Sequence, residues 1–72
     1  MVRVMREVVN LLNLVPGEII EMSDGATVEV LSNPKDGTWI FGRYISSPAD
    51  PSLEGTEEMV FAQEIVGIVK TP

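Results

Sequence analysis

After Pro16-Gly17 the chain is divided into short runs by regularly spaced turn residues, and this rhythm restricts the possible folds most. Asp24-Gly25 and the Asn-Pro-Lys-Asp-Gly segment at 33–37 combine the residues that favour tight turns and positive φ. The runs between these turns are rich in β-branched and aromatic residues, as strands are. The sequence therefore predicts five antiparallel strands and a single 3₁₀ turn at 63–64; the strands cover 18–22, 27–31, 38–46, 57–61 and 65–69.

The first fifteen residues have a different pattern. Apolar side chains recur at the three- and four-residue spacing of an amphipathic helix, at Val4, Met5, Val8, Leu11, Leu12 and Val15. Polar residues gather on the opposite side of that helix, and Leu14 is the one apolar residue that does not fit. We expect an α-helix over 1–15 that stops at Pro16-Gly17. Because four of the first nine residues are valines, which disfavour helix, a strand over 1–9 is the alternative.

The length of 72 residues predicts one domain, 1–72. Five short meandering strands are most economically arranged as a small barrel, since closure removes exposed sheet edges. The order of strands and turns over 18–70 resembles the SH3-like small-barrel superfold. The expected fold class is therefore mainly β with one N-terminal α-helix, packed on a five-stranded antiparallel SH3-like small barrel.

Two stretches are similar to the motifs of Sm-like proteins. The segment KDGTWIFGRYI has Asp36-Gly37 at its turn and Gly42 five positions later, as the first Sm motif does. The segment EMVFAQEIVGIV shares the apolar positions of the second motif at Val60, Ile65 and Ile68. This resemblance implies nucleic-acid binding. Where that family has the Arg-Gly of its RNA pocket, however, this chain has Phe61-Ala62.

Several predicted strands are apolar on both faces, although a one-sheet barrel needs apolar residues on one face only. Met59 and Phe61 oppose Val60, for example, and Trp39 and Phe41 oppose Ile40. A small barrel cannot enclose all of these side chains, so we expect the N-terminal helix to cover the second face. Any surface left uncovered implies self-association or a partner. The helix positions Val4, Val8 and Leu11 are accordingly candidate contact residues.

Composition excludes several kinds of chemistry. The chain has no cysteine and no histidine, which removes disulfides, thiolate nucleophiles and imidazole acid–base catalysis. The net charge of −6 disfavours nucleic acid and anionic membranes as partners. The segment 50–58 imitates the start of a calcium loop, but Phe61 stands where the twelfth-position carboxylate is needed. We interpret 48–58 as a solvated acidic loop, and we expect no metal, no cofactor and no catalytic residues.

The remaining candidate contact residues are a tryptophan expected to be partly exposed and four acidic residues: Trp39, Asp50, Glu54, Glu57 and Glu58. Arg43 is expected to neutralise a strand neighbour such as Glu29. These features favour a cytoplasmic, non-enzymatic protein–protein interaction or accessory module without a small-molecule substrate. The alternatives are an Sm-like nucleic-acid-binding protein, the small subunit of an enzyme complex and, from the amphipathic segment 1–15, a protein that binds a membrane surface.

Overall fold

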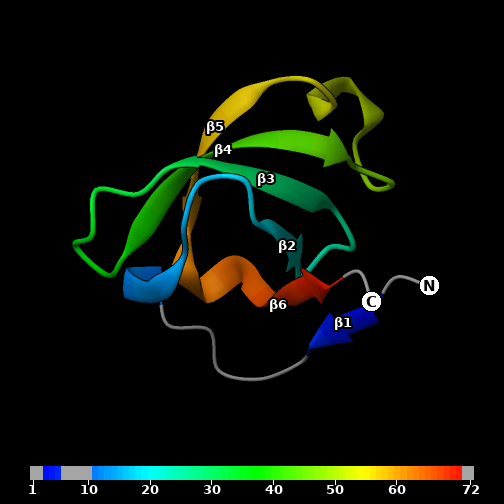
Figure 1. Cartoon of the computed structure of the whole chain (residues 1–72). Helices are drawn as coiled ribbons and strands as arrows, with labels where there is room; N and C mark the ends of the chain where they lie inside the picture. The colour runs from blue at the N-terminus through cyan, green and yellow to red at the C-terminus, as the bar shows by residue number, and fades with distance from the viewer. Residues whose placement is uncertain (1–2, 6–10, 71–72) are drawn as a thin grey trace.

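The computed structural model describes residues 3–5 and 11–70 and is built around one antiparallel sheet (Figure 1). Its six strands lie in the order β1-β6-β2-β3-β4-β5. They are β1 (Arg3–Met5), β2 (Ile19–Met22), β3 (Thr27–Ser32), β4 (Trp39–Ser46), β5 (Glu57–Phe61) and β6 (Ile65–Lys70). Three single-turn 3₁₀ segments accompany them: η1 (Leu11–Asn13), η2 (Pro51–Leu53) and η3 (Ala62–Glu64).

The five strands predicted after Pro16-Gly17 are confirmed, and their turns use the expected residues. In the β2–β3 hairpin, Gly25 has a φ of 91° and the Asp24 carboxylate accepts a hydrogen bond of 3.0 Å from the Ala26 amide. In the β3–β4 turn the Asp36 carboxylate accepts hydrogen bonds from the amide and hydroxyl of Thr38. These bonds lower the pKa of Asp36. Local turn chemistry thus sets the pairing of β2, β3 and β4.

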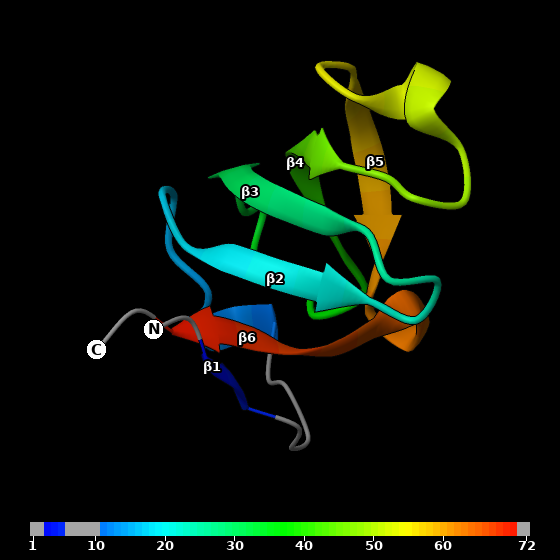
Figure 2. The same cartoon turned by 90° about the vertical axis from the view of Figure 1, so that its right-hand side faces the viewer.

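One face of the sheet carries the core. Side chains at alternate positions of β2, β3, β4 and β5 are almost fully buried: Ile20, Met22, Val28, Val30, Ile40 and Val60. Ala26, Leu11 and Leu14 complete this cluster. Gly42, at the middle of β4, is also buried, and a Cβ at this position would overlap Cγ1 of Val28. The strands form a strongly curled sheet, as the view in Figure 2 shows.

The predicted N-terminal α-helix is wrong. Residues 3–5 form β1, which pairs antiparallel with β6 and sets Val4 beside Val69. Residues 11–13 form a 3₁₀ turn, and no described segment is a helix of seven or more residues. Val8 lies outside the described residues. The valine content that weakened the helix prediction favours the extended conformation found in β1.

The burial of the leucines shows why the pattern was misleading. Leu14, which did not fit the helix, is 2% exposed, whereas Leu12, assigned to the apolar face, is 46% exposed. Leu11 and Leu14 are both buried because a 3₁₀ turn places residues three apart on one side. A spacing of three residues is common to both kinds of helix, so it does not distinguish a single 3₁₀ turn from a longer α-helix.

The predicted closed barrel is also wrong. In residues 3–5 and 11–70, β1 pairs only with β6 and β5 pairs only with β4, so the sheet stays open between these two edges. Register shifts near Glu21/Met22, Thr27/Val28 and Val30/Ser32 increase its curl. The fold is a small, open antiparallel sheet, and the expected assignment to the SH3-like superfold is not confirmed.

Asn33 holds the segment 11–14 against the sheet. Its Nδ2 donates to the carbonyl oxygens of Leu11 and Leu14 at 2.6 and 2.8 Å. Its Oδ1 accepts a hydrogen bond of 2.9 Å from the amide of Lys35, which has a φ of 64°. One side chain therefore satisfies two carbonyls of the 3₁₀ turn and also shapes the β3–β4 turn.

Candidate protein-interaction face

Two apolar side-chain pairs lie on the side of β4 and β5 that faces away from the core. Trp39 is paired with Phe61, and Phe41 is paired with Met59. The intervening residues Ile40 and Val60 are buried in the core, so the two pairs must lie on the opposite side of the sheet. We call the surface formed by Trp39, Phe41, Met59 and Phe61 the outer face of β4–β5.

The hydrogen-bond ladder brings the members of each pair close together. The Tyr44 amide donates to the Thr56 carbonyl at 3.0 Å, and the Ala62 amide donates to the Thr38 carbonyl at 2.9 Å. In an antiparallel ladder, hydrogen-bonded and non-hydrogen-bonded pairs alternate. The pairs at Phe61 and Met59 are therefore of the non-hydrogen-bonded type, in which opposing side chains approach most closely.

The four side chains are accessible to solvent to different degrees. Met59 is 49% exposed and Phe61 is 41% exposed, while Trp39 and Phe41 on the neighbouring strand are partly buried. Trp39, the aromatic residue that the sequence singled out for partial exposure, is thus of intermediate burial. Single exposed apolar residues are common on protein surfaces. Here, however, aromatic and methionine side chains adjoin on one face, and these residue types are enriched in protein–protein interfaces.

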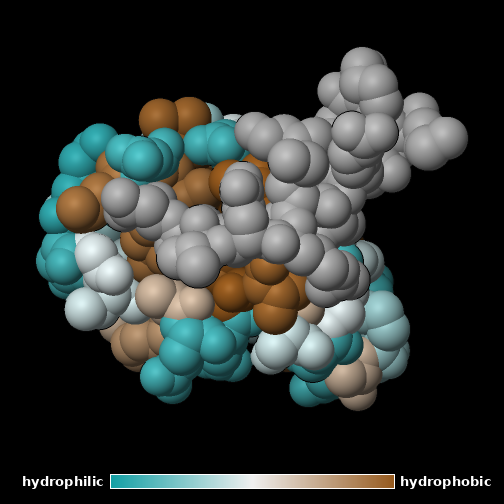
Figure 3. Space-filling model, turned by 90° about the horizontal axis from the view of Figure 1, so that it is seen from below, coloured by the Kyte–Doolittle hydropathy of each residue, from teal (hydrophilic) through white to brown (hydrophobic). Residues whose placement is uncertain are grey.

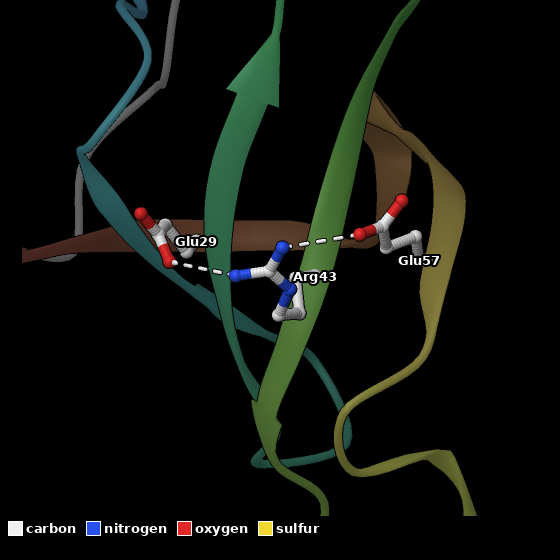
Figure 4. A network of polar contacts seen from close by, with 3 residues as sticks. All are labelled: Glu29, Arg43 and Glu57. Atoms are coloured by element: carbon white, nitrogen blue, oxygen red, sulfur yellow. Dashed lines mark hydrogen bonds and ion pairs between the residues drawn. The ribbon is translucent and has the colours of Figure 1, made fainter.

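A polar network of Glu29, Arg43 and Glu57 (Figure 4) lies one register position beyond the Phe41–Met59 pair. The Arg43 guanidinium lies 3.1 Å from a carboxylate oxygen of Glu57 on β5 and 4.0 Å from one of Glu29 on β3. The predicted pairing of Arg43 with Glu29 is therefore confirmed, and Glu57 is an additional partner. Because all three side chains are solvent-exposed, each pair contributes less than about 1 kcal/mol to stability. The network holds the Arg43 guanidinium between Glu29 and Glu57.

The acidic loop before β5 uses two of its carboxylates to hold its own backbone. Asp50 caps η2 by accepting a hydrogen bond of 3.2 Å from the Ser52 amide. Glu54 accepts one of 3.2 Å from the amide of Ser47, whose side chain is buried. No three acidic side chains within the described ranges are arranged to hold a metal ion. The geometry gives Asp50 and Glu54 a structural role in shaping the loop.

The structure distributes the residues singled out from the sequence over three places. Val4 lies in β1 at one edge of the sheet, and Leu11 is buried in the core with 3% exposure. Trp39 belongs to the outer face of β4–β5, and Glu57 and Glu58 begin the edge strand beside it. All three lie at the opposite edge of the sheet from β1, with Trp39 at one end of the β4–β5 ladder and Glu57 and Glu58 at the other.

Sequence reasoning did not select Phe41, Met59 or Phe61 as contact residues. Their signal was present in the alternation of β4 and β5, which are apolar on both faces. They were assigned to a surface covered by the N-terminal helix, and residues 3–5 and 11–13 of that segment are a strand and a 3₁₀ turn instead. Because the described residues place no such helix over β4 and β5, the same alternation indicates an exposed face.

Other exposed apolar residues lie outside these two pairs. Ile45 is two residues after Arg43 on β4, and Leu12 and Val15 lie around η1. Figure 3 shows the side on which β6 lies in Figure 1, where hydrophobic and hydrophilic residues both reach the surface. Among the residues that the structure describes, no helix is long and apolar enough to cross a membrane. On the outer face of β4–β5, two pairs of large apolar side chains lie at neighbouring register positions.

The relation to known proteins is restricted to a general fold class. Six antiparallel strands around one core place the chain among small β folds. No protein-family model matches the chain, and no curated protein or solved structure shows significant similarity to it.

Proposed function

We propose that this chain is a non-enzymatic protein-interaction module that binds a partner protein through the outer face of β4–β5. The observation that supports this proposal is the adjacency of Trp39, Phe41, Met59 and Phe61 on a solvent-accessible side of the sheet. Covering them with a complementary protein surface removes apolar area from water, which is the main favourable term in association.

The chemistry of this face matches that of the central part of a protein interface. Tryptophan, phenylalanine, methionine and arginine are enriched there. Here an aromatic pair is followed by a Phe–Met pair and then by Arg43, whose guanidinium is held by Glu29 and Glu57. Aromatic side chains at the centre of interfaces often account for most of the binding free energy. Trp39 and Phe61 are therefore the expected anchors.

The nucleic-acid alternative has less support on this face. Stacking of bases on aromatic side chains is normally accompanied by several lysines and arginines that contact phosphates. Along the β4–β5 ladder the cation next to the Phe41–Met59 pair is Arg43, and two carboxylates already flank it. The surrounding charge therefore favours a protein partner over a polyanion.

Selection from a random dodecapeptide library displayed on phage tests the proposal. The bait is the full chain, and enriched peptides are then measured against the double variant Met59→Ser/Phe61→Ser. We expect this variant to bind them at least tenfold more weakly. The matched control is Val15→Ser, which removes an apolar side chain of similar exposure (51%) near η1 and should leave binding unchanged.

Two results would contradict the proposed function. One is the absence of any enriched peptide. The other is that the enriched peptides bind the double variant as well as the unmodified chain. Circular dichroism of all three proteins excludes unfolding as the reason for lost binding. Met59, Phe61 and Val15 are all exposed, and substitutions at exposed positions usually change stability by no more than about 0.5 kcal/mol.

A further inference from the structure

We infer that the partner contributes an extended, positively charged segment that pairs with the free edge of β5 as an added strand. This inference rests on the proposed function and specifies how the partner is recognised. β5 is the last strand of the sheet, and in the described part of the chain it pairs with β4 alone. An edge strand of this kind presents unpaired backbone groups along its length.

The register shows which backbone groups of β5 face outward. The hydrogen bonds at Thr56 and Ala62 fix the phase of the ladder, so Glu58 and Val60 bond to β4. Glu57, Met59 and Phe61 therefore direct their amide and carbonyl groups away from β4. These residues span about 14 Å at the usual rise of a strand. An extended segment of five residues is sufficient to pair with all three.

The same three residues connect the edge to the outer face. Met59 and Phe61 have side chains on that face, at 49% and 41% exposure, and backbone groups directed to the free edge. A strand added to β5 would therefore place alternate side chains beside Met59 and Phe61. Backbone pairing would supply part of the affinity, and these side-chain contacts would select apolar residues at alternate positions of the partner.

Charge decides between a different protein and a second copy of this chain. β5 begins with Glu57 and Glu58, and Arg43 is shared between Glu57 and Glu29. One cation beside three carboxylates leaves this edge negative, and Glu58 forms no ion pair with a described side chain. A second copy would bring the same carboxylates and a further net charge of −6. A segment with lysine or arginine next to its apolar residues is complementary.

The acidic residues also explain how the edge remains available. Charged side chains on an edge strand discourage indiscriminate pairing between copies. Glu57 and Glu58 occupy the first two positions of β5, so a second β5 strand would bring four carboxylates to one short pairing region. A basic segment meets no such repulsion, which makes the same two residues a specificity filter.

A pair of substitutions at Met59 tests strand addition. Met59→Ala removes the side chain, whereas Met59→Pro also removes the outward amide hydrogen and leaves the bonds of Glu58 and Val60 to β4 in place. Proline is tolerated at such edge positions. Using the peptides enriched from the dodecapeptide library as probes, we expect Met59→Ala to weaken binding about threefold and Met59→Pro at least thirtyfold.

A second measurement applies even if Met59→Pro does not fold. The same peptides are synthesised with N-methyl groups on alternate backbone amides, in the two possible phases. We expect one phase to abolish binding and the other to leave it nearly unchanged, because an added strand uses only every second amide. Enriched peptides should carry lysine or arginine, and Glu58→Gln should weaken binding several-fold at low salt.

The outcomes separate this inference from the proposed function. Equal losses for Met59→Ala and Met59→Pro, together with no effect of either methylation phase, overturn strand addition but leave side-chain docking intact. If neither Met59→Ser/Phe61→Ser nor Met59→Pro weakens peptide binding, the proposed function is overturned as well. A concentration-dependent dimer of the full chain by light scattering, abolished by Met59→Pro, would overturn the basic partner in favour of a second copy.

Discussion

Replacement of Asn33 by alanine should destabilise the protein strongly for a single partly buried side chain. The substitution removes two hydrogen bonds to the carbonyls of Leu11 and Leu14 and one from the Lys35 amide. A typical intramolecular hydrogen bond contributes about 0.5–1.5 kcal/mol net. Water can replace part of this at an incompletely buried position, so we expect a loss of about 2–3 kcal/mol.

This loss is large relative to the stability of such a domain. At roughly 0.05–0.15 kcal/mol per residue, 72 residues correspond to a free energy of unfolding of about 4–11 kcal/mol. Urea titration followed by the fluorescence of Trp39, the one tryptophan, measures the change. We expect a lower midpoint at an unchanged m-value, which indicates a change of stability rather than of the surface exposed on unfolding.

The variant Asn33→Asp provides the matched control. It keeps the acceptor for the Lys35 amide but places a carboxylate against two carbonyl oxygens, so at pH 7 it should be less stable than Asn33→Ala. The same repulsion raises the folded-state pKa of the introduced carboxyl above its unfolded value. The penalty is therefore full at neutral pH, decreases as pH falls below that folded-state pKa, and is absent below the unfolded value. A loss below about 0.5 kcal/mol for Asn33→Ala, or equal stability of both variants at pH 7, would refute the reasoning.

Two further predictions concern the core and the ionisation of one tyrosine. Gly42→Ala should cost about 2–3 kcal/mol in urea titration, because its Cβ would overlap Val28 Cγ1 and lie 3.0 Å from the Glu29 carbonyl oxygen. The exposed change Ile45→Thr on the same strand should stay within about 0.5 kcal/mol, and equal effects of the two would contradict this packing. The pKa of Tyr44 is raised, mainly by burial and to a smaller extent by the negative charges of Asp24, Glu64 and Glu58. Absorbance titration at alkaline pH should thus give a higher midpoint for Tyr44 in the folded protein than in denaturant. The folded protein should lose stability as pH rises above about 10. Coincident midpoints would contradict this prediction.

The strands after Pro16-Gly17 could be predicted because local chemistry determines them. Asp24-Gly25 and 33–37 force turns at defined places, and the alternation around Ile40 and Val60 identifies the core face. Such signals act over a few residues and need no knowledge of distant parts of the chain. The partial exposure of Trp39 and the pairing of Arg43 with Glu29 follow from the same strand positions.

The N-terminal segment could not be predicted from local signals. β1 depends on pairing with β6, more than sixty residues later in the sequence, and the 3₁₀ turn at Leu11–Asn13 depends on the side chain of Asn33. Both are tertiary contacts that override a helical spacing. The error extended to the candidate site, since the supposed helix was assigned to the surface that includes Met59 and Phe61.

The two ends of the described chain meet on β1 and β6, where Arg3 stands opposite Lys70. This pair lies at one extreme of the strand order, with β5 at the other, as Figures 1 and 2 both show. A reporter, an affinity handle or a neighbouring domain joined to either end would consequently emerge away from β5. The protein can therefore be tethered to a sensor chip through either end while the strand proposed to receive a ligand points into solution.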